Sequence, residues 1–216
     1  EKGRGNSIMY PISEVDAIVD EDDLKEEGFS LANLVGSLRL GRELDLSALS
    51  MDLQNTNYHP ETYPSMIYRP FEDRSVSVLT PSSGRLAIVG AKSKQELIDG
   101  VDDFLAALIE LGIETDKTSN DILIQNMVAN YDFGREFDLP VVAVALDLNN
   151  VEYEPEQFPG LIYRSDSGNS TVLLFTSGKL VVTGANTYLE VIQARDELYA
   201  RLEDIGIELS KETASR

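Results

Sequence analysis

Two residue types that carry much of enzyme and metal chemistry are almost missing from this 216-residue sequence, which has no cysteine and one histidine, His59. Without cysteine, disulfides, thiolate catalysis and cysteine-based metal sites are excluded, and His59 has no partner for a histidine-rich site. We therefore expect no metal and no cofactor.

Catalytic motifs are missing as well. Gly90, Lys92 and Ser93 look superficially like a phosphate-binding loop, but Ala91 separates the glycine from the lysine and the required spacing is absent. No Ser/His/Asp set can be built beyond His59, and no motif pairs the many carboxylates. The sequence therefore predicts a protein that is not an enzyme.

Long apolar runs are also absent. No window approaches the roughly 18 apolar residues of a membrane-spanning helix, and no basic segment followed by an apolar one resembles a secretory signal. Because 42% of the residues are hydrophobic, the chain has enough apolar side chains for a folded core. These features predict a soluble, cytoplasmic protein.

Basic residues are scarce: 18 Lys and Arg stand against 38 Asp and Glu, giving a formal net charge of -20. Phosphate affinity comes from Lys and Arg, so this balance by itself argues against nucleic acid. The alternative is adaptation to molar salt, where the Debye length shrinks to about 3 Å and an acidic surface keeps a protein hydrated. We favour salt adaptation because only seven of the basic residues are lysine.

Residues 1–30 differ from the rest of the chain. Acidic residues crowd this segment, apolar residues are few, and no periodicity is sustained, so we predict a flexible or loosely docked acidic extension. Two interpretations remain open, a solvated tail or a mimic of DNA that folds over a basic surface.

From residue 31 onward the sequence repeats itself. Residues 58–69 (YHPETYPSMIYR) return as residues 153–164 (YEPEQFPGLIYR), with seven of the twelve positions identical. Two further pairs of segments follow the same order, 41–46 with 134–139 and 83–91 with 177–185. Such self-similarity indicates two copies of one structural unit.

Each copy predicts the same elements. An opening strand (31–40 or 122–133) leads into a short helix near Asp45 or Asp138, and three short strands separated by Gly-containing turns follow. A long helix closes each copy, with one apolar stripe formed by Leu97, Val101, Phe104, Leu108 and Leu111 in the first and by Val191, Ala194, Leu198, Leu202 and Ile205 in the second.

Hairpins with helices on one face make an α+β fold. We expect two tandem repeats, residues 31–119 and 120–209, followed by a tail at 210–216. A pseudo-twofold axis would join their sheets into one continuous antiparallel sheet and leave one broad face uncovered. Such a face could also mediate self-association.

The repeated segments, together with Gln125-Asn126-Met127-Val128, strongly resemble the core of the TATA-box-binding protein family, and look most like its archaeal, salt-adapted members. The resemblance covers about residues 31–209. It implies a saddle with helices on the convex face. It also implies a general transcription initiation factor that binds and bends A/T-rich promoter DNA through the minor groove and recruits transcription factor B and RNA polymerase.

The resemblance assigns four wedge positions, Tyr63, Pro81, Phe158 and Phe175. Unstacking a base step costs a few kcal/mol in minor-groove architectural proteins, TATA-box-binding proteins among them, and a large flat apolar group offsets that cost. Phe158 and Phe175 lie at loop edges, where an aromatic residue is a candidate for exposure.

The resemblance also assigns residues that face the base edges: Asn33, Val35, Ala87, Val89, Asn126, Val128, Val181 and Thr183. An asparagine amide can donate to adenine N3 and thymine O2, which the minor groove presents almost alike for A·T and T·A. Small apolar side chains suit a groove from which no guanine amino group protrudes.

Phosphate contacts are implied at Arg69, Arg85, Lys92, Arg164 and Lys179, and contacts with transcription factor B at Glu154, Glu156 and Gln157. Arg164 taken alone would more often be a surface salt bridge. In a chain this acidic, basic residues at matched positions of both copies favour a basic strip.

The two copies depart from the family pattern unequally. The first has Tyr63 and Pro81 as wedges and Val89 where threonine is expected, and Asn186 of the second replaces an expected lysine. We therefore predict that the second copy grips DNA more firmly. The alternative is a diverged paralogue with weakened DNA binding that acts through protein partners.

Overall fold

The computed structural model describes residues 9–146, 150–166, 168–207 and 209. The chain divides into two compact units. The first-repeat unit contains residues 9–14 and 33–125, and the second-repeat unit contains residues 15–32 and the chain from residue 126 onward. The first three residues of the opening strand therefore group with the second repeat.

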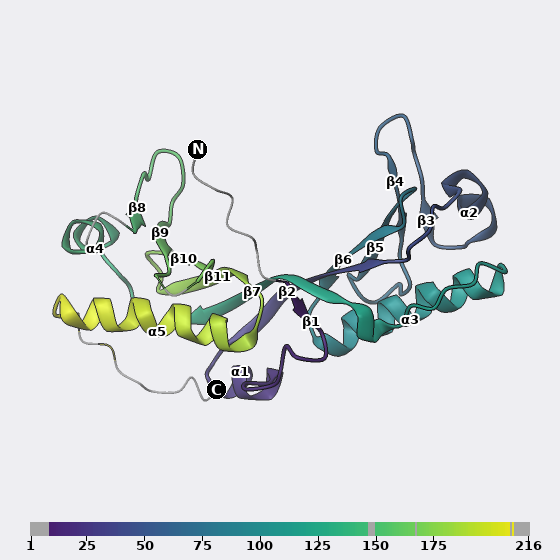
Figure 1. The fold of residues 1–216 in the computed structure, drawn as a ribbon. Coiled ribbons are helices and arrows are strands. Elements are labelled where there is room, and N and C mark those ends of the chain that lie inside the picture. The colour runs from purple at the N-terminus through teal and green to yellow at the C-terminus, as the bar shows by residue number, and fades with distance from the viewer. Residues whose placement is uncertain (1–8, 147–149, 167, 208, 210–216) are drawn as a thin grey trace, which may run out of the picture. The chain divides into compact units, whose positions relative to one another are not determined.

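The first-repeat unit is an antiparallel sheet with a long helix on one face (Figure 1). Its strands lie in the order β2 (Ser30–Arg39), β6 (Arg85–Ala91), β5 (Ser77–Pro81), β4 (Ser65–Tyr68) and β3 (Thr56–Asn57). Helix α3 (Lys94–Glu110) packs on β5 and β6, α2 (Leu46–Asp52) lies beside β4, and the short helix η1 (Ser119–Asp121) precedes β7.

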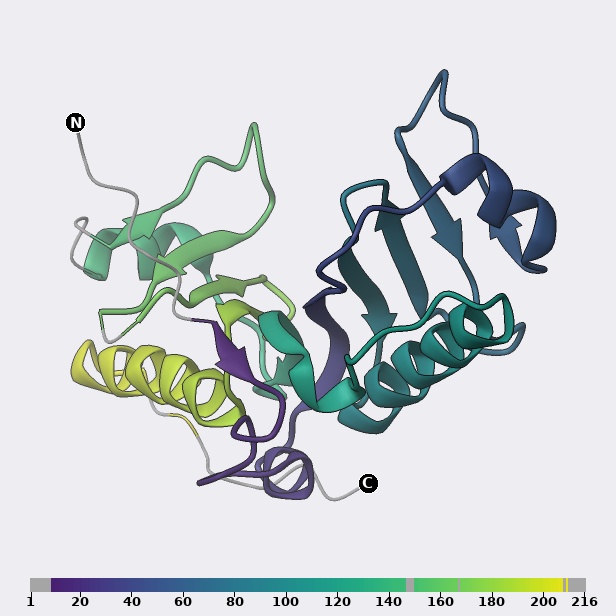
Figure 2. The ribbon, with the colours of Figure 1, turned by 45° about the vertical axis from the view of Figure 1, so that its right-hand side comes forward.

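The second-repeat unit has the same elements in the same order (Figure 2). Its strands are β7 (Leu123–Asp132), β11 (Lys179–Ala185), β10 (Thr171–Leu174), β9 (Leu161–Arg164) and β8 (Val151–Glu152). Helix α5 (Tyr188–Asp204) packs on β10 and β11, and α4 (Leu139–Ala145) follows β7. The predicted strands and helices are confirmed for both repeats.

Capping residues explain where the helices begin. The side chains of Asp45 and Asp138 accept backbone N–H groups at the starts of α2 and α4, and Ser93 and Thr187 do the same for α3 and α5. Each cap satisfies a donor that the first helical turn leaves without an intrahelical partner. These four residues occupy matched positions of the two repeats, so capping residues of the same kind determine where the helices of both copies begin.

The core of each unit lies between the sheet and its long helix. The apolar stripe of α3 is buried from Leu97 to Leu108, and that of α5 from Val191 to Leu202, against alternate residues of the strands. Leu111 is 39% exposed because α3 has already ended at Glu110, so the predicted stripe is one residue too long there. The opposite face of each sheet carries no helix in the described residues of its own unit.

Residues 9–30 differ from the expectation of a flexible extension. Strand β1 (Tyr10–Pro11) pairs antiparallel with Leu123 and Ile124, and helix α1 (Glu21–Glu26) packs on α5. The reason is a sparse set of apolar side chains at irregular spacing, Ile12, Val15, Leu24 and Phe29, all buried. Most of the acidic residues between them are exposed, while Asp16 and Glu21 are half-buried. Residues 1–8 of the predicted extension and the predicted tail at 210–216 lie outside the described residues.

Candidate nucleic-acid interface

The candidate interface residues occupy the sheet face opposite the long helices. In β2 and β6 the even-numbered residues Leu34, Leu86 and Ile88 are buried on the side of α3. Successive side chains of a strand point to opposite faces, so the odd-numbered residues lie on the other face: Asn33, Val35, Ala87 and Val89. In the second-repeat unit Asn126, Val128, Val181 and Thr183 occupy the corresponding face. All eight side chains are partly exposed. We call this surface the open face of each unit.

Two asparagines are held by matching hydrogen bonds. The Oδ1 atom of Asn33 accepts the backbone N–H of Gly90 at 2.9 Å, and that of Asn126 accepts the N–H of Gly184 at 2.7 Å. Because a backbone N–H can only donate, each amide is oriented with its oxygen toward the protein backbone. The Nδ2 group of each side chain is thereby left to donate on the open face.

A β-bulge makes this arrangement possible. The register shifts between Leu34 and Gly36 in one ladder and between Val182 and Ala185 in the other. Gly90 and Gly184 have φ values of +83° and +85°, and a Cβ atom there would lie 2.3 Å and 2.6 Å from backbone carbonyl oxygens. Only glycine fits, and the bulge turns its N–H toward the asparagine. The repeated Gly-Ala segment in the sequence was the signal for this bulge.

The predicted wedges of the second repeat lie together. The rings of Phe158 and Phe175 are 5.8 Å apart between centroids and meet at 64°, edge to face. Gly160 lies against both rings, since a Cβ atom there would be 2.7 Å from Cε1 of Phe158 and 3.1 Å from Cε1 of Phe175. Both rings are partly exposed.

The first repeat has no such pair. Tyr63 is 44% exposed, and Pro81 lies directly opposite Ser65 across the β4–β5 ladder. Ser65 occupies the place that Gly160 holds in the second repeat, as the matched segments 58–69 and 153–164 show. The ring pair of the second repeat therefore has no counterpart at Tyr63 and Pro81.

The predicted phosphate ligands are all exposed, but their pairing differs. Arg164 forms a salt bridge with Glu152 at 3.0 Å, so the surface ion pair that the residue type suggests is present. Within the part of the chain that the structure describes, Arg69, Arg85, Lys92 and Lys179 form no ion pair. These four cations are available to an external anion.

The predicted contacts for transcription factor B lie in the turn between β8 and β9. The backbone N–H groups of Gln157 and Phe158 both donate to the carbonyl oxygen of Glu154, and the Gln157 amide donates to the Glu154 carboxylate. These bonds close a compact turn whose side chains Glu154, Glu156 and Gln157 are exposed. The same turn fixes the backbone of Phe158.

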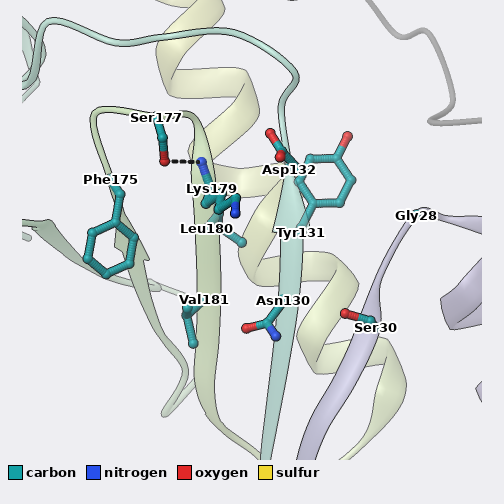
Figure 3. A pocket seen from close by; sticks show the side chains of 10 residues that line it. All are labelled: Gly28, Ser30, Asn130, Tyr131, Asp132, Phe175, Ser177, Lys179, Leu180 and Val181. Carbon is teal, nitrogen blue, oxygen red and sulfur yellow. Dashed lines mark hydrogen bonds between the residues drawn. The ribbon is translucent and has the colours of Figure 1, made fainter.

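An open cavity of about 570 Å³ lies where β7 ends and β11 begins (Figure 3). Phe175 and Val181 line one side, and Asn130, Asp132 and Tyr131 the other. Lys179 lies directly opposite Asp132 in the ladder, and its backbone N–H donates to the Ser177 hydroxyl at 3.4 Å. Sequence reasoning missed Asn130 and Asp132, because only the strand register shows that they share this face with Val181 and Lys179.

Comparison with known proteins decides the family. The model described as transcription factor TFIID (or TATA-binding protein, TBP) matches residues 28–111 and 121–205, one segment for each repeat. The chain belongs to the TATA-binding protein family. The resemblance read from the sequence, the transcription-factor class and the α+β fold with two tandem repeats are thereby confirmed.

Relatives in halophilic archaea are similar over most of their length. The TATA-box-binding protein of Natronomonas pharaonis is 39% identical over 182 residues, which are 84% of this chain and 96% of that protein. TATA-box-binding protein E of Halobacterium salinarum is 38% identical over 84% of this chain and 97% of its own. The solved structure of Methanococcus jannaschii TBP matches with a TM-score of 0.72 and 36% identity, covering 82% of this chain and 99% of that one.

The described part of this TATA-binding protein family member contains no group of three or more His, Cys, Asp or Glu side chains that could hold a metal ion. Among the same residues no helix is both long and apolar enough to cross a membrane.

Proposed function

We propose that this chain is a general transcription initiation factor that binds A/T-rich promoter DNA through the minor groove. The observation that carries the proposal is the pair of asparagine–glycine bulges, in which Asn33 and Asn126 each keep a fixed amide N–H donor on the open face. The family to which the chain belongs supports the same function.

The chemistry of the minor groove favours such donors. A·T and T·A pairs present acceptors at adenine N3 and thymine O2, whereas a G·C pair adds the protruding amino group of guanine. A fixed N–H donor complements the first pattern and opposes the second. Val35, Val128 and Val181 supply apolar surface that cannot accept a hydrogen bond from a guanine amino group.

The aromatic pair supports bending. Phe158 and Phe175 present an edge-to-face pair of rings beside the open face, large enough to enter a base step and to stack on the exposed bases. In the first repeat Tyr63 and Pro81 take this role. Phosphate ligands at Arg69, Arg85, Lys92, Arg164 and Lys179 would hold the backbone of the bent duplex.

Recruitment of transcription factor B fits the turn between β8 and β9. Glu154, Glu156 and Gln157 form a rigid, exposed, acidic turn that a basic surface of a partner could bind. RNA polymerase would then be recruited indirectly, in the cytoplasm of an archaeal cell.

The deciding experiment is a fluorescence anisotropy titration with three labelled duplexes across 0.1 to about 3 M KCl, a range that takes the Debye length from about 10 Å to below 3 Å. The first duplex has an A/T-rich box, the second has G·C pairs in its place, and the third has inosine·C pairs. Inosine lacks the amino group of guanine, so I·C matches A·T in the minor groove and G·C in the major groove.

We expect the A·T and I·C duplexes to bind alike and the G·C duplex to bind at least ~10-fold more weakly, which corresponds to ~1.4 kcal/mol. A salt-adapted acidic protein should need salt to bind, whereas a basic binder weakens as salt rises. Absence of binding to every duplex at every salt concentration would overturn the proposal.

A second function is favoured by one observation, the lack of an aromatic pair in the first repeat. In that case the chain is a diverged paralogue that binds transcription factor B without DNA and regulates by titrating it. Binding of purified transcription factor B with equal affinity in the presence and absence of the A/T-rich duplex, together with no DNA bending, would support this alternative.

A further inference from the structure

The two repeats carry unequal charge at matched positions of the open face. Arg39 lies directly opposite Arg85 in the β2–β6 ladder. The matched pair in the second repeat is Asp132 opposite Lys179 in the β7–β11 ladder (Figure 3). One repeat therefore sets two cations side by side where the other sets a cation beside an anion.

The same difference recurs at a second place. Arg164 is the last residue of β9 and forms an ion pair with Glu152 of the neighbouring strand. Arg69 follows β4, and the residue that matches Glu152 in its neighbouring strand is the uncharged Asn57. A third place lies after β6 and β11, where exposed Lys92 is matched by Asn186, which is only 3% exposed. At the second and third places the cation of the first repeat is free and that of the second repeat is paired or absent. At the first place Lys179 forms no ion pair, but its cross-strand neighbour is an anion where that of Arg85 is a cation.

Two like charges directly opposite each other in an antiparallel pair destabilise it, because their Cβ atoms are about 5 Å apart. Among the described residues no carboxylate lies within salt-bridge distance of Arg39 or Arg85. Both side chains are exposed. A phosphate between the two guanidinium groups would accept hydrogen bonds from both and remove their repulsion.

We infer that Arg39 and Arg85 together form a seat for one DNA phosphate, and that the two repeats divide the work of binding. The first repeat supplies the larger share of the phosphate contacts, and the second supplies the aromatic ring pair of Phe158 and Phe175. This inference rests on the proposed DNA-binding function. It adds Arg39 to the interface, a residue that the repeated motifs do not single out.

The division of labour follows from what each repeat lacks. Without an aromatic pair, the first repeat gains little from stacking and depends on the release of counterions from the phosphates it neutralises. In the second repeat, an acidic residue lies beside each cation: Asp132 opposite Lys179, and Glu152 in an ion pair with Arg164. These carboxylates lower the binding free energy that a phosphate contact would contribute there. The contact made by the first repeat should therefore be more sensitive to salt.

The test compares salt dependence rather than affinity at one salt concentration. Arg39→Gln removes one of the two guanidinium groups that form the proposed phosphate site. Arg74→Gln is the matched control, because Arg74 carries the same charge but pairs with Asp99 of α3 on the helix side at 2.9 Å. Asp132→Arg rebuilds the two-cation arrangement in the second repeat. The slope of log K against log [KCl] on the A/T-rich duplex is measured for each variant, and thermal unfolding confirms that each is folded.

We expect the slope of Arg39→Gln to be about one unit more positive than that of Arg74→Gln, and the slope of Asp132→Arg to be about one unit more negative than that of the parent. The loss in Arg39→Gln should be the same for all A/T-rich sequences, because a phosphate carries no sequence information. Equal slopes for Arg39→Gln and Arg74→Gln would overturn the inference while leaving the proposed function intact. A parent protein that binds no duplex at any salt concentration would overturn both.

Discussion

The ring edges of Phe158 and Phe175 meet over Gly160, at a centroid distance of 5.8 Å. The pair depends on the missing side chain of that glycine, because a Cβ atom would approach both Cε1 atoms more closely than 3.2 Å. The first repeat has Ser65 at this position and no ring pair beside it. The repeat with the ring pair thus has glycine at this position, and the repeat without it has serine.

Gly160→Ser should separate wedging from folding. The new Cβ atom comes closest to the two rings, which can rotate away, and lies 3.3 Å from the carbonyl oxygen of Leu174. We therefore expect the free energy of unfolding to stay within about 1 kcal/mol of that of the parent. The rings would lose their edge-to-face contact and their shared orientation. The expected result is a smaller DNA bend, measured by fluorescence transfer between the ends of a labelled duplex.

Ser65→Gly serves as the control for this change. It makes the matching position of the first repeat a glycine, but no second ring is present to pair with Tyr63. The bend should therefore stay that of the parent. If Gly160→Ser folds and leaves the bend unchanged, the ring pair is not what bends the duplex.

Alanine substitutions compare the two repeats directly. Phe158→Ala should reduce the bend and weaken binding by ~1–3 kcal/mol, the range found when an aromatic side chain that stacks on a base is removed. Tyr63→Ala should have a smaller effect, because its neighbour Pro81 offers no ring for broad stacking. Bend and affinity are measured on the same labelled duplex, and equal losses for the two variants would contradict the predicted asymmetry.

Asn126→Asp should reverse the chemistry of the open face without disturbing the bulge. An aspartate oxygen can still accept the N–H of Gly184, but the second oxygen replaces an N–H donor with an acceptor. That oxygen would face adenine N3 and thymine O2. We expect affinity for the A/T-rich duplex to fall by at least ~1–3 kcal/mol, measured by anisotropy, while stability stays near that of the parent.

Asn126→Ala distinguishes binding from folding at this site. It removes the acceptor for the partly buried N–H of Gly184, so the free energy of unfolding should fall by ~1–3 kcal/mol as well. Asn33→Asp repeats the test in the first repeat. A normal affinity in both aspartate variants would show that the amides do not read the groove.

Much of the fold could be predicted from the sequence because its signals are local. The apolar stripe from Leu97 to Leu108 recurs at helical spacing, and Asp45 and Asp138 are helix caps at matched positions. The candidate wedges and asparagines were assigned by the resemblance to the family. The sequence does not show which amide atom of Asn33 or Asn126 is hydrogen-bonded within the protein, and that bond determines which atom is free to contact DNA.

Register was the part that could not be predicted. The bulges at Gly90 and Gly184 change which residues lie opposite one another, so the Arg39–Arg85 neighbourhood is not visible in the order of residues. The docked N-terminal segment is a similar case. Arg195, only 7% exposed, stacks on Phe29 and Tyr131 and bonds to Glu27 from a distant part of the chain.

Salt should stabilise this protein by screening its own surface. The net charge of -20 repels itself most strongly at low ionic strength, and the Debye length falls from about 10 Å at 0.1 M to about 3 Å at 1 M. We expect the midpoint of thermal unfolding to rise steeply up to about 1 M KCl and then to level off, because further screening adds little. Differential scanning calorimetry at constant pH measures this curve. Ions that are excluded from the protein surface would instead give a steady rise through 3 M.

The control variant replaces the exposed Glu14 and Glu26 by lysine, which lowers the net negative charge and should flatten the first part of the curve only. A midpoint that falls with added KCl would rule out salt adaptation as the reason for the acidic composition.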